Sequence, residues 1–214
     1  MYFFDLDGTL LDSNGIWLQI DVEFLGLYGI TPVPKDYTEF VSHNSFSASA
    51  HYTKQRFGLP MSVDEIVVQW QAMAAEHYAH HLPMKPGARE LLLALAARGE
   101  SLAVLTSCVP HLCSSALERL DILRLFHSIH YSHLMGIEKS EPELYLQLAA
   151  LEGRAPHDCV LFDDSPDYCA AAKKAGWQVW GVWDSLFDFR KQEMKALCGE
   201  DRYLISLESV ITLL

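Results

Sequence analysis

The sequence has few basic residues and no long apolar run. Its 16 Lys and Arg residues face 28 Asp and Glu residues, which gives a formal charge of −12 at pH 7. A nucleic-acid partner requires a basic footprint, so this balance argues against one. No apolar stretch reaches the length of a membrane-spanning helix. We therefore expect neither a nucleic-acid nor a membrane partner, and an anionic substrate would need local positive charge or a metal ion.

Cysteine pairs of the kind that bind zinc are also missing. The five cysteines are odd in number and irregularly spaced, and no two of them have the Cys-x-x-Cys spacing. This pattern indicates neither a zinc site nor a disulfide framework, so we expect reduced thiols. Asp5 comes too early for the apolar segment of a signal peptide to precede it. The expected location is therefore the cytoplasm.

What the chain does have is enough apolar sequence for a substantial core. Half of its 214 residues are hydrophobic, which suits one large domain or a core with an insert. Strand-like segments occupy 2–4, 101–106, 128–132, 159–162 and 177–183, and helical patterns occupy 87–99, 111–121, 142–153 and 167–176. Strands that alternate with helices are typical of parallel βαβ units. We therefore predict an α/β fold with a doubly wound parallel sheet.

Residues 14–84 do not follow this alternation. They contain helical patterns alone, over 14–29, 34–58 and 62–81, separated by the turn-forming segments TPVP and GLP. A block of helices after the first strand indicates a second, inserted domain. We predict an α/β core of residues 1–13 and 85–214 and an all-helical domain of residues 14–84. The chain would cross between them near Asp12–Gly15 and Leu82–Gly87, where LPMKPG has the character of a hinge.

Carboxylate, hydroxyl and amine side chains follow the predicted strands. In parallel sheets, ligands bind beyond the carboxyl ends of the strands. The residues found there are Asp5 and Asp7, then Thr106 and Ser107, then Lys139, and finally Asp163 and Asp164. Carboxylates gathered at one edge repel one another unless something neutralises them. Mg²⁺ would do so, because it favours oxygen ligands.

Each of these side-chain types has a use in phosphoryl transfer. One carboxylate can attack phosphorus to form an aspartyl-phosphate, and a second can protonate the leaving oxygen and then activate water. Hydroxyl groups and the N–H groups at a helix start can hold phosphate oxygens. A lysine can neutralise charge on the nucleophile and on the transferring group. The residues themselves thus predict phosphoryl-transfer chemistry with a divalent cation.

Four segments resemble the motifs of the haloacid dehalogenase superfamily, in its group with a helical C1 cap. They are DLDGTLLDS, VLTS, EKSEPELY and LFDDSPDYCAAAKKAGW, and they appear in the order of the family. The resemblance covers essentially the whole chain. It implies a Rossmann-like core and an active site that the inserted helical domain closes.

The resemblance also implies a role for each matched residue. Asp5 would be the nucleophile, and Asp7 the general acid/base whose backbone carbonyl binds the metal. Asp164 would bind Mg²⁺, with Asp163 beside it or acting through water. The remaining matches are Thr106 and Ser107, which would bind the substrate phosphate, and Lys139, the lysine of the third motif.

Two residues depart from the fourth motif. Asp167 and Tyr168 stand where small residues and glycine are common in the family. We interpret Asp167 as an acidic residue in the first turn of its helix, where the helix dipole stabilises its negative charge. The other interpretation is that Asp167 is a distant carboxylate of the site.

The predicted function is a Mg²⁺-dependent phosphatase that hydrolyses a small phosphorylated metabolite, in a chain that we expect to be a monomer. One alternative is a phosphosugar mutase of the β-phosphoglucomutase type, which must bind a second phosphate, usually through arginine. The second helical segment of the insert has no arginine at its centre, and Arg56 comes only at its end. Another alternative is a non-catalytic sensor of a phosphorylated ligand. The complete set of Asp5, Asp7, Lys139 and Asp164 argues against a sensor.

Overall fold

The computed structural model describes residues 1–42 and 46–211, and it divides into two compact units. One unit comprises Met1–Asn14 and Leu82–Leu214, and the other comprises Gly15–His81. These boundaries lie close to those predicted for a core and an inserted domain. That the second unit works as a cap stays a prediction.

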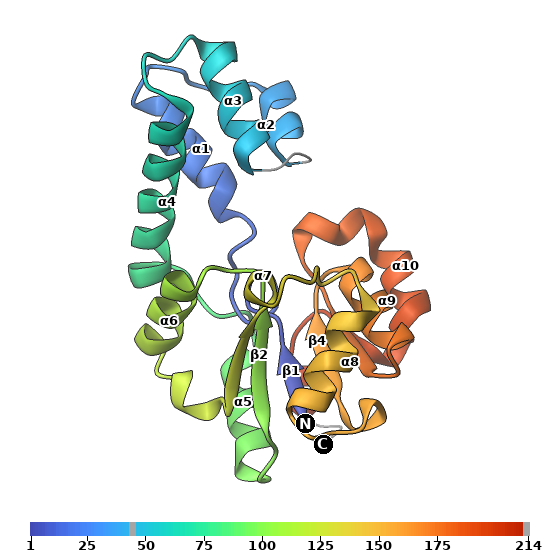
Figure 1. Cartoon of the computed structure of the whole chain (residues 1–214). Helices are drawn as coiled ribbons and strands as arrows, with labels where there is room; N and C mark the ends of the chain where they lie inside the picture. The colour runs from blue at the N-terminus through green and yellow to red at the C-terminus, as the bar shows by residue number, and fades with distance from the viewer. Residues whose placement is uncertain (43–45, 212–214) are drawn as a thin grey trace. The chain divides into compact units, whose positions relative to one another are not determined.

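The first unit is built on a parallel sheet of six strands in the order β3-β2-β1-β4-β5-β6 (Figure 1). The strands are β1 (Tyr2–Phe4), β2 (Leu102–Thr106), β3 (Ser128–Tyr131), β4 (Val160–Asp163), β5 (Gln178–Val182) and β6 (Tyr203–Leu204). In the centre, Phe3 lies opposite Ala103 of β2 and Leu161 of β4. The strand order changes direction between β1 and β4, which is the point where such sheets bind ligands. The predicted doubly wound α/β fold is thus confirmed.

Helices flank the sheet on both faces. They are α5 (Ala88–Ala97), α6 (Pro110–Arg119), α7 (Ser132–Met135), α8 (Pro142–Leu151), α9 (Pro166–Lys174), α10 (Lys191–Cys198) and α11 (Glu208–Ile211). Because alternate residues of a strand point to opposite faces, Phe3 and Phe4 enter different layers. Phe3 joins a buried cluster with Tyr145 of α8 and Ala172 of α9. Phe4 stacks on Phe162 at 4.8 Å between ring centroids.

Short 3-10 helices connect some of these elements. They cover Leu123–Leu125, Pro156–Asp158, Ser185–Arg190 and Glu200–Arg202. The sequence patterns did not predict Ser185–Arg190, α7, α10, α11 or β6. Each of these elements is short, or lies in the C-terminal stretch for which no element was predicted.

The second unit contains four described helices, α1 (Ile16–Gly26), α2 (Lys35–Ser42), α3 (Phe46–Phe57) and α4 (Val63–His80). A capping box starts α4, since Glu65 N donates to Ser62 Oγ (3.1 Å) and Ser62 N donates to Glu65 Oε2 (2.6 Å). Phe24 and Trp70 join α1 to α4 through an edge-to-face contact of 5.7 Å. The helix predicted over 34–58 is present on both sides of 43–45, and those three residues lie outside the described part.

The two connecting segments are hydrogen bonded to each other within the first unit. Asp12 N donates to Pro83 O (3.0 Å), and Lys85 N donates to Leu10 O (2.9 Å). At the start of α5, Gly87 has a φ of +78°, and a Cβ there would lie 2.2 Å from Glu208 N. Only glycine fits that close approach. The segment predicted as a hinge is therefore held firmly where it meets the core.

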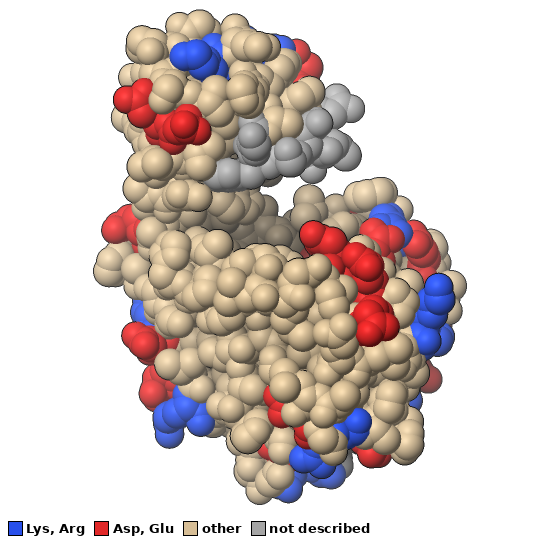
Figure 2. All heavy atoms as spheres, in the orientation of Figure 1, with Lys and Arg blue, Asp and Glu red and all other residues tan. Residues whose placement is uncertain are grey.

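The surface drawn in Figure 2 mixes acidic and basic side chains on the first unit. Such interspersed charge is common on protein surfaces. Among the helices of residues 1–42 and 46–211, none has both the length and the apolar character needed to cross a lipid bilayer.

Candidate active site

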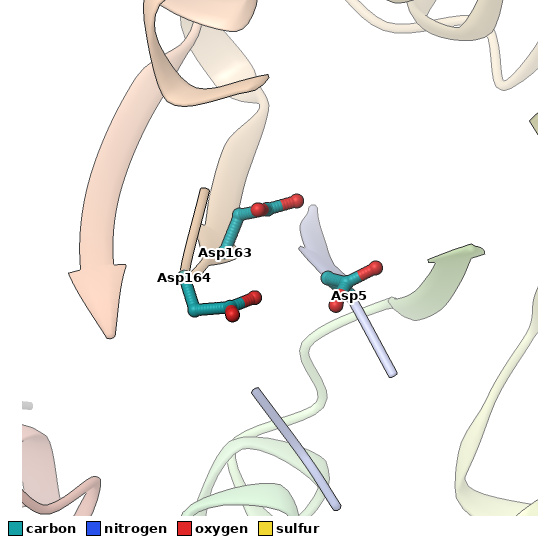
Figure 3. Close-up of side chains that lie close together, drawn as sticks. All are labelled: Asp5, Asp163 and Asp164. Atoms are coloured by element: carbon teal, nitrogen blue, oxygen red, sulfur yellow. The ribbon is translucent and has the colours of Figure 1, made fainter. Parts of the chain in front are cut away.

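Three buried carboxyl groups meet at the ends of β1 and β4. Asp5 directly follows β1, Asp163 is the last residue of β4, and Asp164 follows it. Carboxylate oxygens of the three residues lie within 4.8 Å of one another, and Figure 3 shows the side chains of Asp163 and Asp164 extending toward Asp5. The pairing of the strands fixes this arrangement, because Asp5 N still donates to Phe162 O (2.9 Å). Adjacent parallel strands therefore deliver carboxylates from distant parts of the chain to one point.

Lys139 binds two of these carboxylates. Its Nζ donates to Asp5 Oδ1 (2.6 Å) and to Asp163 Oδ2 (2.8 Å), and the residue is only 1% exposed. The hydroxyl of Tyr145 donates to the Lys139 carbonyl (2.8 Å), which fixes the backbone at this point. Burial acts to lower the pKa of Lys139, but the carboxylates of Asp163 and Asp5 raise it well above its usual value. Lys139 is therefore a permanent positive charge within the cluster.

Burial has the opposite effect on the carboxyl groups. It raises the pKa of Asp5 to about 7, although the Lys139 ammonium acts to lower it. The pKa of Asp164 is also raised well above its usual value, first by burial and then by the charges of Asp5 and Asp163. The ammonium of Lys139 thus does not offset the effect of burial on Asp5 and Asp164. A divalent cation fits this donor set, because it would supply the missing charge and accept oxygen ligands.

The loop that follows β1 holds Asp164 through two hydrogen bonds. Thr9 Oγ1 donates to Asp164 Oδ1 (3.2 Å), and Asn14 Nδ2 donates to Oδ2 (3.0 Å). Gly8, the residue before Thr9, has a φ of +83°, and a Cβ there would come within 2.3 Å of both Asn14 Nδ2 and Asp164 Oδ2. The glycine of DLDGT is therefore required by the close approach of the loop to this carboxylate.

The other predicted residues lie around the same point. Asp7 accepts a hydrogen bond from Ser13 Oγ (2.7 Å), and it lies outside the group of three close carboxylates. Thr106 Oγ1 accepts from Cys108 N (2.9 Å), at the loop before α6. Ser107 Oγ lies 3.1 Å from Ser132 Oγ. Ser107 does not cap α6, because the residue at that position is Val109.

These residues line one cavity of about 200 Å³. Its lining includes six of the seven residues predicted for the site, namely Asp5, Asp7, Thr106, Ser107, Lys139 and Asp164. The seventh, Asp163, is wholly buried and binds Lys139 without lining the cavity. The structure thus brings the sequence-predicted residues together, with Asp163 behind the others.

The cavity is also lined by six residues that were not assigned to the site from the sequence. They are Asn14, Cys108, Ser165, Tyr168, Leu186 and Phe187. Tyr168 carried a signal, because it departs from the family motif, and its ring centroid lies 4.6 Å from Lys139 Nζ. Asp167 lies in the first turn of α9, as expected, and pairs with Arg190 through both carboxylate oxygens (2.7 and 2.9 Å).

Comparison with known proteins identifies the family. A model described as haloacid dehalogenase-like hydrolase matches residues 2–182. A phosphorylated carbohydrates phosphatase of Thermotoga maritima is 27% identical over 195 residues, 86% of each chain. A candidate pseudouridine-5'-phosphatase of Drosophila melanogaster is 30% identical over 182 residues, which cover 82% of this chain and 78% of that protein.

A solved structure shows the same fold. It is a candidate β-phosphoglucomutase of Thermotoga maritima, which superposes with a TM-score of 0.86 at 22% identity, over 99% of this chain and 96% of that one. At this identity the likeness concerns the fold alone. The match of the family model to most of the chain supports the assignment to this family, and the relatives named as phosphatases support a phosphoester hydrolase. The chain therefore belongs to the haloacid dehalogenase-like hydrolases.

Proposed function

We propose that this hydrolase is a Mg²⁺-dependent phosphatase that cleaves the phosphate ester of a small phosphorylated metabolite. The observation that carries the proposal is the ion-pair arrangement at the ends of β1 and β4. One buried ammonium bridges Asp5 and Asp163, and Asp164 lies beside them in an open cavity. The phosphatases among the relatives favour the same class of substrate.

The proposed metal ligands are Asp5, Asp164 and the backbone carbonyl of Asp7, with Asp163 acting beside them or through water. The oxygen-rich donor set and the excess of buried negative charge support Mg²⁺ at this point. When bound, the cation would offset the charge that an incoming phosphate adds to the acidic site.

In the first proposed step, a carboxylate oxygen of Asp5 attacks the phosphorus. The Asp5 oxygen–phosphorus bond forms, and the bond from phosphorus to the leaving oxygen breaks. Asp7 gives its proton to that oxygen, so the product leaves as a neutral alcohol. Thr106 and Ser107 hold the phosphoryl oxygens from the end of β2. Lys139 stabilises the negative charge that spreads over the transferring group.

In the second step, water replaces Asp5. Asp7, now ionised, takes a proton from the water while the oxygen of that water bonds to phosphorus. The bond to Asp5 breaks, and inorganic phosphate leaves with the original carboxylate restored. Asp7 ends the cycle protonated, as it began, and no other reactant is consumed.

We further propose that the helical unit Gly15–His81 is a cap that opens and closes over the site during turnover. Its insertion between β1 and α5 through two connecting segments supports this role. The cytoplasmic location and the monomeric state stay predictions.

The test is a phosphate-release assay on a panel of phosphorylated metabolites, with Mg²⁺ and then with a chelator. We expect release that depends on Mg²⁺, and an enzyme that releases phosphate from no member of the panel would contradict the proposal. The mutase alternative is tested with β-glucose 1-phosphate and a trace of glucose 1,6-bisphosphate. Rapid formation of glucose 6-phosphate with little free phosphate would favour the mutase.

A further inference from the structure

One wall of the cavity is apolar, and the α/β unit supplies it. Tyr168 comes from the first turn of α9, and Leu186 and Phe187 come from the 3-10 helix Ser185–Arg190. They line the same cavity as the carboxylates of Asp5 and Asp164. Leu186 is 45% exposed, so its side chain is left open to water beside a charged site. Apolar surface in a binding pocket is relieved when a ligand covers it with apolar surface of its own.

This wall is fastened at both ends. At its start, Asp184 Oδ1 accepts a hydrogen bond from Leu186 N (2.8 Å), and Lys85 Nζ donates to the other oxygen of the same buried carboxylate. At its end, Arg190 binds both carboxylate oxygens of Asp167, the neighbour of Tyr168. The 3-10 helix is thus tied to the second connecting segment and to α9. A wall held in this way costs little further ordering when a ligand binds.

The wall begins directly at the reacting centre. The Tyr168 ring centroid is 4.6 Å from the Nζ of Lys139, and that nitrogen donates to the proposed nucleophile Asp5. Because Asp5 and Lys139 are joined by a hydrogen bond of 2.6 Å, a phosphate would lie in the cavity beside this pair, and Tyr168, Leu186 and Phe187 also line the same cavity. The part of the substrate that meets the wall is then the leaving group rather than the phosphate.

We propose that Tyr168, Leu186 and Phe187 form a specificity wall that packs against the C–H face of a ring in the leaving group. Two aromatic side chains and one aliphatic side chain match such a face, which is rigid and apolar. An open-chain polyol would have to be ordered on binding and would turn hydroxyl groups toward the wall without hydrogen-bond partners. The enzyme therefore selects phosphate esters of cyclic alcohols, such as sugars in ring form. This inference rests on the proposed phosphatase function.

A matched pair of substrates tests the wall. Glucose 6-phosphate carries a six-membered ring, and glucitol 6-phosphate is its open-chain reduction product with the same phosphate position. Phe187→Ala and Leu186→Ala should each lower kcat/KM for the ring substrate by about tenfold, and lower it for the open-chain substrate by no more than about threefold. Most of the loss should appear in KM, because the wall touches the leaving group and leaves the reacting atoms alone.

Phe189→Ala is the matched control. Phe189 lies on the same 3-10 helix, is 79% exposed and is not among the residues that line the cavity. It should leave the ratio of the two kcat/KM values unchanged. If Phe187→Ala and Leu186→Ala lower both substrates equally, or if Phe189→Ala changes the ratio as they do, the inference is overturned while the phosphatase proposal stands. If the wild-type enzyme releases phosphate from neither ester nor from any other monoester with Mg²⁺, both fail.

Discussion

Both units of the molecule bury carboxyl groups, but the groups that surround these carboxyls differ. In the α/β unit, Asp5, Asp163 and Asp164 lie within 4.8 Å of one another and share the single ammonium of Lys139. In the helical unit, Asp21 of α1 accepts a hydrogen bond from the Tyr37 hydroxyl (3.0 Å). That hydroxyl also lies 3.0 Å from Thr53 Oγ1, so the polar group of α1 is tied to α2 and α3.

The difference lies in how each setting can be neutralised. Burial raises the pKa of Asp21 to about 6, against the Tyr37 hydrogen bond that lowers it, so protonation alone can remove this charge. Burial also raises the pKa values of Asp5 and Asp164, but there a cation can hold the carboxyl groups ionised. Burial of a carboxyl group is therefore a weak sign of function. Several carboxyls gathered in an open cavity are a stronger one.

The largest contrast should come from removing one carboxylate in each unit. Asp5→Asn removes the proposed nucleophile and should lower phosphate release by at least about 10⁴-fold. Asp21→Asn replaces a carboxyl that is equally buried but lies in the helical unit, and it should keep turnover near that of the wild type. Steady-state phosphate release with Mg²⁺ measures both. Turnover of Asp5→Asn within tenfold of the wild type would show that the role is misassigned.

A smaller loss is expected from Asp7→Asn. This change keeps the shape of the side chain and removes the proposed proton donor, which is typically worth about 10² to 10⁴-fold. An ester whose leaving group is a good one, such as p-nitrophenyl phosphate, needs less protonation and should lose less than an alkyl ester. An equal loss with both esters would argue against a general acid at Asp7.

Mg²⁺ should stabilise the protein through the carboxyls of the α/β unit and not through Asp21 of the helical unit. At about 100 times its dissociation constant, a ligand of the folded state adds about 2.7 kcal/mol to the free energy of unfolding. Thermal melts with and without Mg²⁺ should therefore differ by several degrees for the wild type and for Asp21→Asn. Asp164→Asn should lose most of that difference. Identical wild-type melts at saturating Mg²⁺ would contradict a metal site at the strand ends.

The pH dependence of stability tests the carboxyl group of the helical unit, Asp21. The pKa of Asp21 rises from 3.8 to about 6 on folding, so the folded protein binds this proton more tightly than the unfolded chain. The stabilisation is fully present below pH 3.8 and is lost as the pH rises through about 6. Asp21→Asn stays neutral throughout.

The free energy of unfolding of the wild type should accordingly fall relative to Asp21→Asn by about 1 to 3 kcal/mol between pH 4 and pH 7. Urea unfolding at each pH, followed by a signal from the helical unit such as Trp70 fluorescence, measures the difference. Parallel curves for the two proteins would show that the Asp21 carboxyl does not lose its proton across this range.

Much of the fold and of the site could be predicted from local sequence. Segments such as SLAVLT are short apolar runs bounded by turns, and β2 fills that run almost completely. The site residues Asp5 and Asp163 follow such runs directly, and Asp164 comes next, so the ends of the strands place all three. The helix boundaries also follow local signals, as the Ser62 capping box does for α4.

The rest depends on contacts that sequence patterns do not report. Asn14 reaches Asp164 across the fold, and nothing near Asn14 in the sequence indicates that partner. The two-residue strand β6 and the 3-10 helix Ser185–Arg190 are too short for a periodic pattern. Leu186 and Phe187 could therefore not be assigned to the cavity from the sequence. Tyr168 was visible only as a departure from the family motif.

The most direct test of the account is to trap the covalent intermediate. The enzyme is mixed with substrate and Mg²⁺, quenched in acid during steady-state turnover and reduced with borohydride, which converts an aspartyl-phosphate to homoserine. Mass spectrometry then locates the converted residue. The account predicts homoserine at Asp5 alone, and its loss in Asp5→Asn. Homoserine at Asp7, Asp163 or Asp164 in the wild type would contradict it.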